Sequence, residues 1–508
     1  MMPYPCPRVK KARRSKGVAI WIGMACAFVL MLVGSVVAVA RYGPLFDDER
    51  RVAPPVADGG SAIDRAIAKG VAYLKAEQKA NGTWGESHPA GLAALSTLAL
   101  LESGVPSTDP HVLRGLRFVR EGVPTLDKTY ELALAILVLD RLKQPEDDGR
   151  IEAMALRLIA GQTPGGGWSY GCPVLPSQGR DLLTALRQAR PSRPGDLFVQ
   201  GPDGRSLSRL FEPGVRMVGL PVQSSDSDRP LLRTDPVGGN PADRQSSSTP
   251  QAVPAFPADR QPPSAPRAVP AFPESLRGVP ALQPFDKTPT LPDDDDSDNS
   301  NTQFAALALW AARHRGVPVE TALARVVSRF RNSQKPTGGW GYLYQSSEAA
   351  AASLDTTTPS MTGAGLICLA MGWGLADTGT LRASEDESRN DPAIRKGLDT
   401  MGQCVGYPAG WPPRPGKPEP PLDLYYLWTL ERVGVLYNVP TLGQRDWWGW
   451  GCDEILGCQR RNGSWDTGGY RGARPVTDTC FALLFLRRSD LSFGLSGQME
   501  KLRLVKTP

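Results

Sequence analysis

The stretch "QRRNGSW", Gln459–Trp465, places a Gly four residues after a Gln and a Trp two residues after that Gly. One such stretch says little, because Asn-Gly is a common turn dipeptide and Trp a common core residue. The same spacing recurs in "QKANGTW" (Gln78–Trp84), "QTPGGGW" (Gln162–Trp168) and "QKPTGGW" (Gln334–Trp340). A stretched version, "QCVGYPAGW", runs from Gln403 to Trp411. We name the four regular copies the Gln–Trp turns.

Each part of a Gln–Trp turn suits a connection between two helices. A helix end leaves carbonyl groups without partners, and a Gln carboxamide carries both a donor and an acceptor. Gly lets the backbone turn sharply, and Trp buries a large apolar surface. We therefore interpret the turn as a structural clamp that joins an outer helix to the next inner helix. The alternative is that the Trp rings stack on a sugar ligand.

Amphipathic and uniformly apolar segments alternate on either side of these turns, and strand signals are almost absent. The amphipathic segments lie near 62–78, 110–121, 149–161, 318–333, 391–402 and 446–458. The apolar segments lie at 90–105, 129–142, 301–317, 360–375, 424–438 and 477–490. An amphipathic helix covers a surface, whereas a helix that is apolar all round is buried. The pattern predicts an all-α fold of outer and inner helix pairs.

The first 60 residues predict a membrane anchor. Six basic residues within 1–17 equal the formal net charge of +6, so the remainder is formally neutral and offers no basic face for nucleic acid. The uncharged run 18–40 is long enough to cross a bilayer, and a signal peptide cleaved after "AVA" is the alternative. The positive-inside rule places 1–17 in the cytoplasm, 41–60 as a linker, and the folded part on the non-cytoplasmic side of a single-pass membrane protein.

A proline-rich segment interrupts the helical pattern. Of the 48 prolines, 22 fall between 173 and 297, a stretch without Trp or Tyr, so it has little apolar surface with which to order itself. We expect a disordered insert over 181–297 that docks a protein partner, with "DLLTALRQAR" (181–190) as a short helix at its root. The halves of the folded part are then 61–180 and 298–492, followed by a tail, 493–508.

The repeated turns between outer and inner helices resemble the terpene cyclase and protein prenyltransferase superfamily, in particular its prenyltransferase and squalene oxidase repeat members. The resemblance covers about 61–180 and 298–492. It implies an (α/α)6 toroid whose inner helices surround a central cavity lined near their N-terminal ends.

The resemblance also implies where a catalytic acid would lie. Squalene and hopene cyclases open one inner helix with a DxDD motif whose middle aspartate protonates an alkene. The run Asp293–Asp296 matches it formally, but adjacent acids at a disordered edge are usually solvated. Alignment on the following helix instead puts the motif on Asp298–Asn301, with Ser300 in the place of the acid. We therefore expect standard cyclase chemistry to be lost.

The sequence contains only a weak candidate for a zinc site. Protein prenyltransferases bind zinc through a D-x-C pair and a later His. Asp478 and Cys480 match that pair, but no His follows them, and a capping Asp before a buried Cys is the simpler interpretation. We predict no cofactor.

The remaining candidates are polar residues at the mouths of inner helices. Catalytic candidates are Asp298, Asp423, Asp478 and Glu131, and cavity-rim binding candidates are His88, Tyr130, Asn301, Gln303, Tyr425 and Tyr426. The first hypothesis is an exported toroid that binds a lipid-like, glycan or protein ligand without standard chemistry. The second is an active enzyme of the same superfamily acting on an isoprenoid, and the third is a carbohydrate-active toroid with paired carboxylates.

Overall fold

The computed structural model describes residues 61–175, 179–190, 273–283, 295–344, 357–376, 391–489 except 414 and 417, and 495–496. This part is built almost entirely from helices, which confirms the all-α prediction. Within it, the named strands are the two short strands of one antiparallel hairpin, β1 (Thr441–Leu442) and β2 (Arg445–Asp446).

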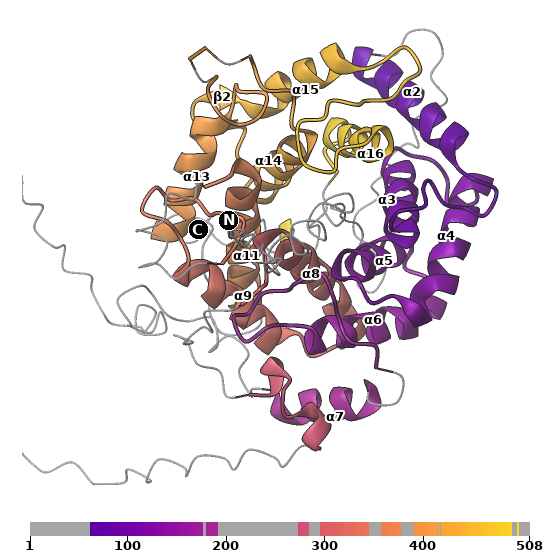
Figure 1. Cartoon of the computed structure of the whole chain (residues 1–508), viewed down its shortest axis with the longest axis vertical. Coiled ribbons are helices and arrows are strands. Elements are labelled where there is room, and N and C mark those ends of the chain that lie inside the picture. Colours follow the sequence, from indigo (N-terminus) through magenta and orange to yellow (C-terminus); the bar gives the residue numbers. More distant parts are fainter. Residues whose placement is uncertain are drawn as a thin grey trace, which may run out of the picture.

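The helices form an outer and an inner layer, as Figure 1 shows. The outer helices are α2 (Ala62–Glu77), α4 (Pro110–Gly122), α6 (Asp148–Ala160), α9 (Glu320–Asn332), α13 (Pro392–Cys404) and α15 (Trp447–Cys458). The inner helices are α3 (Pro89–Glu102), α5 (Thr129–Leu142), α8 (Asn299–Ala312), α11 (Pro359–Ala376), α14 (Leu424–Leu436) and α16 (Pro475–Leu486). These bounds follow the amphipathic and apolar segments of the sequence.

The inner helices pack in chain order, and the order closes on itself. Helix α3 contacts α5, and the contacts continue through α8, α11, α14 and α16. Helix α16 then contacts α3, and the outer helices α15 and α2 meet beside them. Burial follows the sequence pattern: every residue of α8 is buried, whereas α4 buries one face through Val112, Gly115, Leu116 and Val119.

The four Gln–Trp turns make the same pair of hydrogen bonds. The Nε2 atom of Gln459 donates to the carbonyl oxygen of Gly463 at 3.0 Å and to that of Ala66, in α2, at 2.8 Å. The other three glutamines donate likewise to the glycine of their own turn and to His111, Ala322 or Ala393. The distant acceptor always lies in the following outer helix. The Gln side chains thus join neighbouring outer helices, a connection that the sequence did not predict. The expected connection to the next inner helix is also present at three turns, where the amide of Trp168, Trp340 or Trp465 donates to the hydroxyl of Thr302, Thr362 or Thr479.

The Trp and Gly of each turn are equally constrained. Each Trp is buried and its Nε1 atom donates to a carbonyl ten residues earlier, as Trp465 does to Ile455 at 2.7 Å. Each Gly has a positive φ, +88° at Gly463, and a Cβ there would lie 2.4 Å from the carbonyl oxygen of Lys69. The turn therefore requires Gly both for its backbone conformation and for the close approach of the next outer helix.

The stretched fifth copy forms no such clamp. Trp411 is 39% exposed, and the Gln403 side chain is exposed and makes no hydrogen bond with the described residues. The hairpin is bonded to the end of α13 instead, because Arg445 of β2 donates from Nη1 to the carbonyl of Val405 at 2.9 Å. Trp447 of α15 is buried against α14, with its Nε1 atom 2.7 Å from the carbonyl oxygen of Val439.

The predicted insert, 181–297, has the expected short helix at its root and further described segments, 273–283 and 295–297, towards its other end. Helix α7 (Gly179–Ala189) buries Leu182, Ala185 and Leu186 and packs on α6. Two short 3₁₀ turns, Glu274–Leu276 and Pro280–Leu282, bury apolar residues, and the second packs on α6, α7 and α9. These segments have enough apolar side chains to dock on the helices, which explains their order. The rest of the insert lies outside the described residues.

Asp295 also differs from expectation. We expected the acidic run to be solvated, but the Asp295 side chain is buried, accepts from Thr163 Oγ1 at 3.0 Å and lies 3.9 Å from Arg329 Nη1. Both partners belong to the neighbouring turn and outer helix, so tertiary packing removes this acid from solvent.

The predicted membrane segment, 18–40, lies outside the described residues, as do 1–60 as a whole and most of the tail. Among the described helices, none has the length and apolar character needed to span a bilayer.

Candidate functional site

The four candidate acids all lie at the starts of inner helices. Asp298 and Asp423 are the N-caps of α8 and α14, while Glu131 and Asp478 lie in the first turns of α5 and α16. Each of the four is buried or nearly so, and burial raises the pKa of each carboxyl above its ordinary value. Burial therefore favours the protonated form of each carboxyl more than solvent would.

Asp298 is the most fully hydrogen-bonded of these acids. Its Oδ1 accepts from the backbone amides of Ser300 and Asn301 at 2.9 and 2.7 Å, and its Oδ2 accepts from Asn301 Nδ2 at 2.7 Å. Burial raises its pKa to about 6, although these hydrogen bonds and the charge of Arg329 oppose the rise. Asp298 therefore acts first as a helix cap.

Asp423 and Asp478 influence one another. Burial raises the pKa of Asp423 to about 7, and the charge of Asp478 contributes. Asp478 Oδ2 accepts from the amide of Thr467 at 2.7 Å, and the hydroxyl of Tyr470 also interacts with the Asp478 carboxyl. The loop between them is tight, since a Cβ at Gly469 would lie 2.0 Å from the carbonyl oxygen of Leu422. The two acids thus lie near enough for the charge of Asp478 to raise the pKa of Asp423.

His88 and Glu131 form a second juxtaposition. His88 is the N-cap of α3 with a left-handed φ of +53°, and its Nδ1 atom lies 3.8 Å from Glu131 Oε1. Burial raises the pKa of Glu131 to about 7, with a smaller contribution from Asp127. The structure thus brings these two rim candidates together from neighbouring inner helices.

Ser300, in the place of the cyclase acid, belongs to a polar chain that reaches the middle of α14. Its hydroxyl shares a 2.8 Å hydrogen bond with that of Tyr425, which also accepts from Gln303 Nε2. Gln303 Oε1 in turn accepts from Arg432 Nη2 at 3.1 Å. Sequence reasoning missed Arg432, which is buried with its guanidinium 3.4 Å from the centre of the Trp428 ring. The available signal was the adjacent charged pair Glu431–Arg432 inside a helix of otherwise mainly apolar residues.

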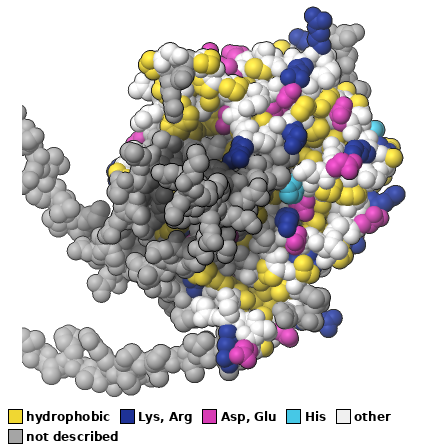
Figure 2. Space-filling view, in the orientation of Figure 1, with side chains coloured by type: hydrophobic (Ala, Val, Ile, Leu, Met, Phe, Trp, Pro, Cys, Tyr) yellow, Lys and Arg dark blue, Asp and Glu magenta, His cyan; other side chains and the backbone are white. Residues whose placement is uncertain are grey.

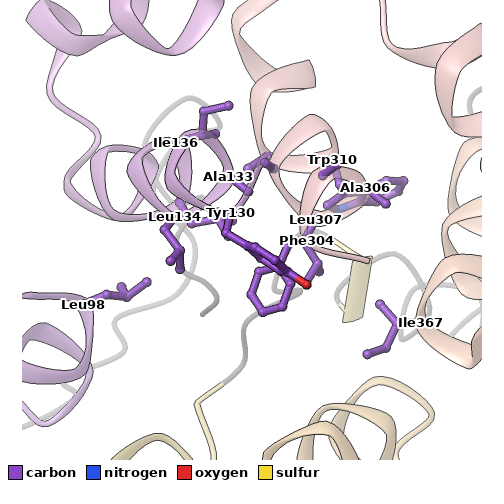
Figure 3. Close-up of a cluster of buried hydrophobic side chains, with 14 of the residues drawn as sticks. Leu98, Tyr130, Ala133, Leu134, Ile136, Phe304, Ala306, Leu307, Trp310 and Ile367 are labelled. Atoms are coloured by element: carbon purple, nitrogen blue, oxygen red, sulfur yellow. The ribbon is translucent and has the colours of Figure 1, made fainter. Parts of the chain in front are cut away.

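Aromatic rings surround this chain. We name Tyr130, Phe304, Tyr425, Trp428, Tyr470 and Phe481 the central aromatic cluster. Neighbouring rings in it lie 5.3–6.0 Å apart, with Trp428 between Phe304, Tyr425 and Phe481. Figure 3 shows Tyr130 and Phe304 side by side, with Leu98 and Ile367 facing the same interior. The candidate Tyr426 is not part of the cluster, because its ring lies against Gly410.

Several polar atoms in and beside the cluster are buried without a hydrogen-bond partner in the described part. They are Tyr130 Oη, Asn301 Oδ1, Trp428 Nε1, and Nε and Nη1 of Arg432. Native cores leave few such groups, because each costs about 1–3 kcal/mol. Atoms of the same kind also occur elsewhere in the described part, as at Thr97 Oγ1 and Ser489 Oγ, but those in the cluster lie beside aromatic rings.

The weak metal candidates do not meet as ligands. Cys480 Sγ donates to Ser96 Oγ at 3.6 Å, and burial raises the pKa of its thiol to about 12. Asp478 is engaged by Thr467. Within the described residues no three His, Cys, Asp or Glu side chains are grouped as metal ligands.

A separate hollow of about 630 Å³ lies between α13 and the hairpin, lined by residues that include Asp399, Gln403, Tyr407 and Arg445. None of the candidate catalytic or binding residues lines this hollow, so it is separate from the candidate site. On the face shown in Figure 2, basic and acidic side chains of the described part are interspersed rather than gathered by sign.

No protein-family model matches the chain, and no curated protein sequence matches it either, so the functional argument rests on the geometry of these residues.

Proposed function

We propose that this chain is an (α/α)6 toroid of the terpene cyclase and prenyltransferase type that binds an apolar, lipid-like ligand at its central aromatic cluster. The segment 18–40 anchors it to a membrane, with the toroid on the non-cytoplasmic side. The closed order of inner helices and the four equivalent Gln–Trp turns support the architecture. The insert provides a docking segment for a protein partner.

The unpartnered polar atoms around the central aromatic cluster carry the proposal. Rings such as Phe304, Trp428 and Phe481 offer apolar contact area, while Tyr130 Oη, Asn301 Oδ1 and Trp428 Nε1 offer a few oriented polar groups. An apolar lining with a small number of convergent polar atoms is the usual composition of a ligand site. A site built only for stability would have satisfied those atoms.

Two features argue against the standard cyclase reaction. Ser300 stands where the protonating aspartate is expected, and its hydroxyl cannot protonate an alkene. The Arg432 guanidinium also occupies a face of Trp428 that a carbocation would otherwise use. A cation roughly 6 Å from Arg432 would be opposed by about 3 kcal/mol at an effective dielectric constant of about 20.

The proposal is tested by incubating the full chain, in neutral-lipid nanodiscs, with radiolabelled squalene or farnesol. We expect the ligand to be retained above empty nanodiscs and recovered unchanged. Trp428→Leu and Phe304→Leu should reduce retention, whereas Trp373→Leu, a buried change outside the cluster, should not. Absence of retention, or a cyclised product that disappears in Asp298→Asn, would overturn the proposal.

The Asp423–Asp478 pair favours a second candidate, an enzyme of the same superfamily that uses a variant acid. Asp478 is buried, and its carboxyl interacts with the hydroxyl of Tyr470 and with Thr467. A protonated carboxyl in such a dry place suits general acid catalysis. Turnover of an isoprenoid or a glycan that is lost in Asp478→Asn, with folding intact, would select this candidate over ligand binding alone.

A further inference from the structure

The proline-rich insert contains one short sequence three times. Val-Pro-Ala, followed by Phe or Leu, occurs at 253–256, 269–272 and 279–282. The first two copies share a longer context, Ala-Val-Pro-Ala-Phe-Pro, and both lie outside the described residues. The third copy belongs to the described part, so it shows how this sequence binds to the folded part of the chain.

The described copy is docked on the outer helices. The side chains of Val279, Ala281 and Leu282 are buried. The 3₁₀ turn that contains the last two packs on α6, α7 and α9, and Arg325 Nη2 donates to the carbonyl oxygen of Gln283 at 3.2 Å. The sequence therefore binds a helical surface through small apolar side chains and a neighbouring backbone carbonyl.

The hollow of about 630 Å³ between α13 and the hairpin offers the same kinds of contact. Its apolar and aromatic side chains are those of Leu398, Val405, Tyr407, Val439 and Leu442. Gln403 and Arg445 add hydrogen-bond donors. The exposed Gln403 carboxamide has no partner among the described residues, whereas its four counterparts in the Gln–Trp turns donate to a carbonyl of the next outer helix. An occupant with apolar side chains and free backbone carbonyls suits this lining.

A Val-Pro-Ala-Phe segment has these properties. Proline has no N–H, so the segment has more backbone acceptors than donors. Extended proline-containing peptides also bind grooves with aromatic side chains at a low entropic cost. The first copy is followed by Asp259 and Arg260, and the hollow carries the complementary charges on Arg445 and Asp399.

The reach of the chain selects the first copy. Helices α9 and α13 separate the described copy from the hollow, because the Gln–Trp turns join α6 to α9 and α9 to α13. Figure 1 shows α7 beside α6, and β2 beside α13, at separate places on the outer rim. Two adjacent helices are roughly 20–24 Å across. Phe256 is 17 positions before Pro273, where the described segment begins, and such a stretch can span up to roughly 60 Å. Phe272 directly precedes Pro273 and lacks this reach.

We infer that residues 253–256 dock in the hollow between α13 and the hairpin of the same chain. The side chains of Val253 and Phe256 fill its apolar part and contribute most of the binding. The donors of Gln403 and Arg445 orient the segment through its carbonyls. The insert thereby provides a connection at the junction where the stretched copy forms no clamp. This inference does not depend on the ligand proposed for the central aromatic cluster.

The test compares hydrogen exchange in the full chain, in neutral-lipid nanodiscs, with that in Phe256→Asp. The amides of 398–405 and 441–446 should exchange about 10-fold faster or more in the variant, the factor expected for the loss of one buried Phe. Phe272→Asp is the matched control, because it alters the same motif in the copy that lacks the reach, and it should leave these amides unchanged. Unchanged exchange in Phe256→Asp, or an equal increase in both variants, would overturn the inference.

A peptide with the sequence of 249–260 gives a second measurement. Calorimetry should show that it binds the Phe256→Asp chain at least about 10-fold more tightly than the wild-type chain, whose own segment competes. Asp399→Arg in the Phe256→Asp chain should weaken this binding, whereas Asp453→Arg, a change at an exposed acid of α15, should not. Equal affinity for a peptide with Asp in place of its Phe would contradict the docking. Protection of the hairpin amides that grows with the concentration of the wild-type chain would place the segment on a second copy and overturn the assignment to the same chain.

Discussion

The carboxamide of Gln459 donates to the carbonyl oxygen of Ala66 at 2.8 Å across 393 positions of the chain. The same bond joins consecutive outer helices at the other three Gln–Trp turns, where the separation is shorter. At Gln459 it instead joins the last outer helix, α15, to the first, α2. A local turn motif therefore also makes a hydrogen bond between the first and the last outer helix of the described part.

The variant Gln459→Leu should lower the free energy of unfolding by about 1–3 kcal/mol, because it leaves the carbonyls of Ala66 and Gly463 without this donor. Chemical denaturation measures the change, and hydrogen exchange should increase in α2. Gln403→Leu is the control, since Gln403 is exposed and unbonded within the described part, and it should change stability by less than about 0.5 kcal/mol. Equal losses in both variants would contradict the clamp.

Gly463→Ala should destabilise the protein by about 3–5 kcal/mol, because the new Cβ would meet the carbonyl oxygen of Lys69 at 2.4 Å. Gly468 offers the matched comparison: its φ is also positive, +69°, but a Cβ there meets nothing within 4 Å. Gly468→Ala should therefore cost only the left-handed strain, about 1–2 kcal/mol. Similar melting temperatures for the two variants would show that helix approach plays no part.

Trp465→Ala should cost about 3–5 kcal/mol, because it removes a buried ring and its bond to Ile455. The corresponding change in the stretched copy, Trp411→Ala, removes a ring that is 39% exposed and should cost less than about 1 kcal/mol. Urea denaturation of both variants compares them directly. If Trp465→Ala removed ligand binding at unchanged stability, the structural role of the ring would be wrong.

The pH dependence of stability should change in Asp423→Asn. Burial raises the pKa of Asp423 from 3.8 to about 7, so the folded state retains a proton that the unfolded state releases. The stabilisation is complete below pH about 4 and is lost as the pH rises towards about 7, which amounts to about 4 kcal/mol. Asn keeps the N-cap to Tyr426 without titrating, so the variant should be more stable than the wild type at pH 8.

Denaturation curves at pH 4 and pH 8 measure this difference. Asp446→Asn, which changes the exposed N-cap of α15, is the matched control for the loss of a capping carboxylate. A wild-type slope that persists in Asp423→Asn would mean that another group is responsible.

The sequence predicted the helices well because the outer helices bury one face at a helical period and the inner helices are apolar all round. Apolar positions around the whole of 424–438 indicate an inner helix, and α14 occupies Leu424–Leu436. The turns were found because Gly and Trp are needed at fixed offsets from a Gln. Both kinds of signal are local in the chain, so both can be recognised without knowing which elements pack against them.

What the sequence could not supply depends on contacts between distant segments. The acceptor of each clamp lies in the next outer helix, and Asp295 is buried by residues of another turn and helix. Arg432 follows the same rule: its position beside Gln303 depends on how α8 and α14 pack. The acids were identified, but only the fold shows that Asp423 and Asp478 influence each other.

The packing of α16 on α2 has a consequence for the connectivity of the chain. Each inner helix packs against the outer helix that follows it in the chain. Helix α16 packs against α2 in the same way, although α2 does not follow it in the sequence. Between α3 and α4 the chain makes the equivalent step with the short connection 103–109. A linker of that kind between the end of α16 and the start of α2, with new termini opened elsewhere, would give a circular permutant with every helix contact retained.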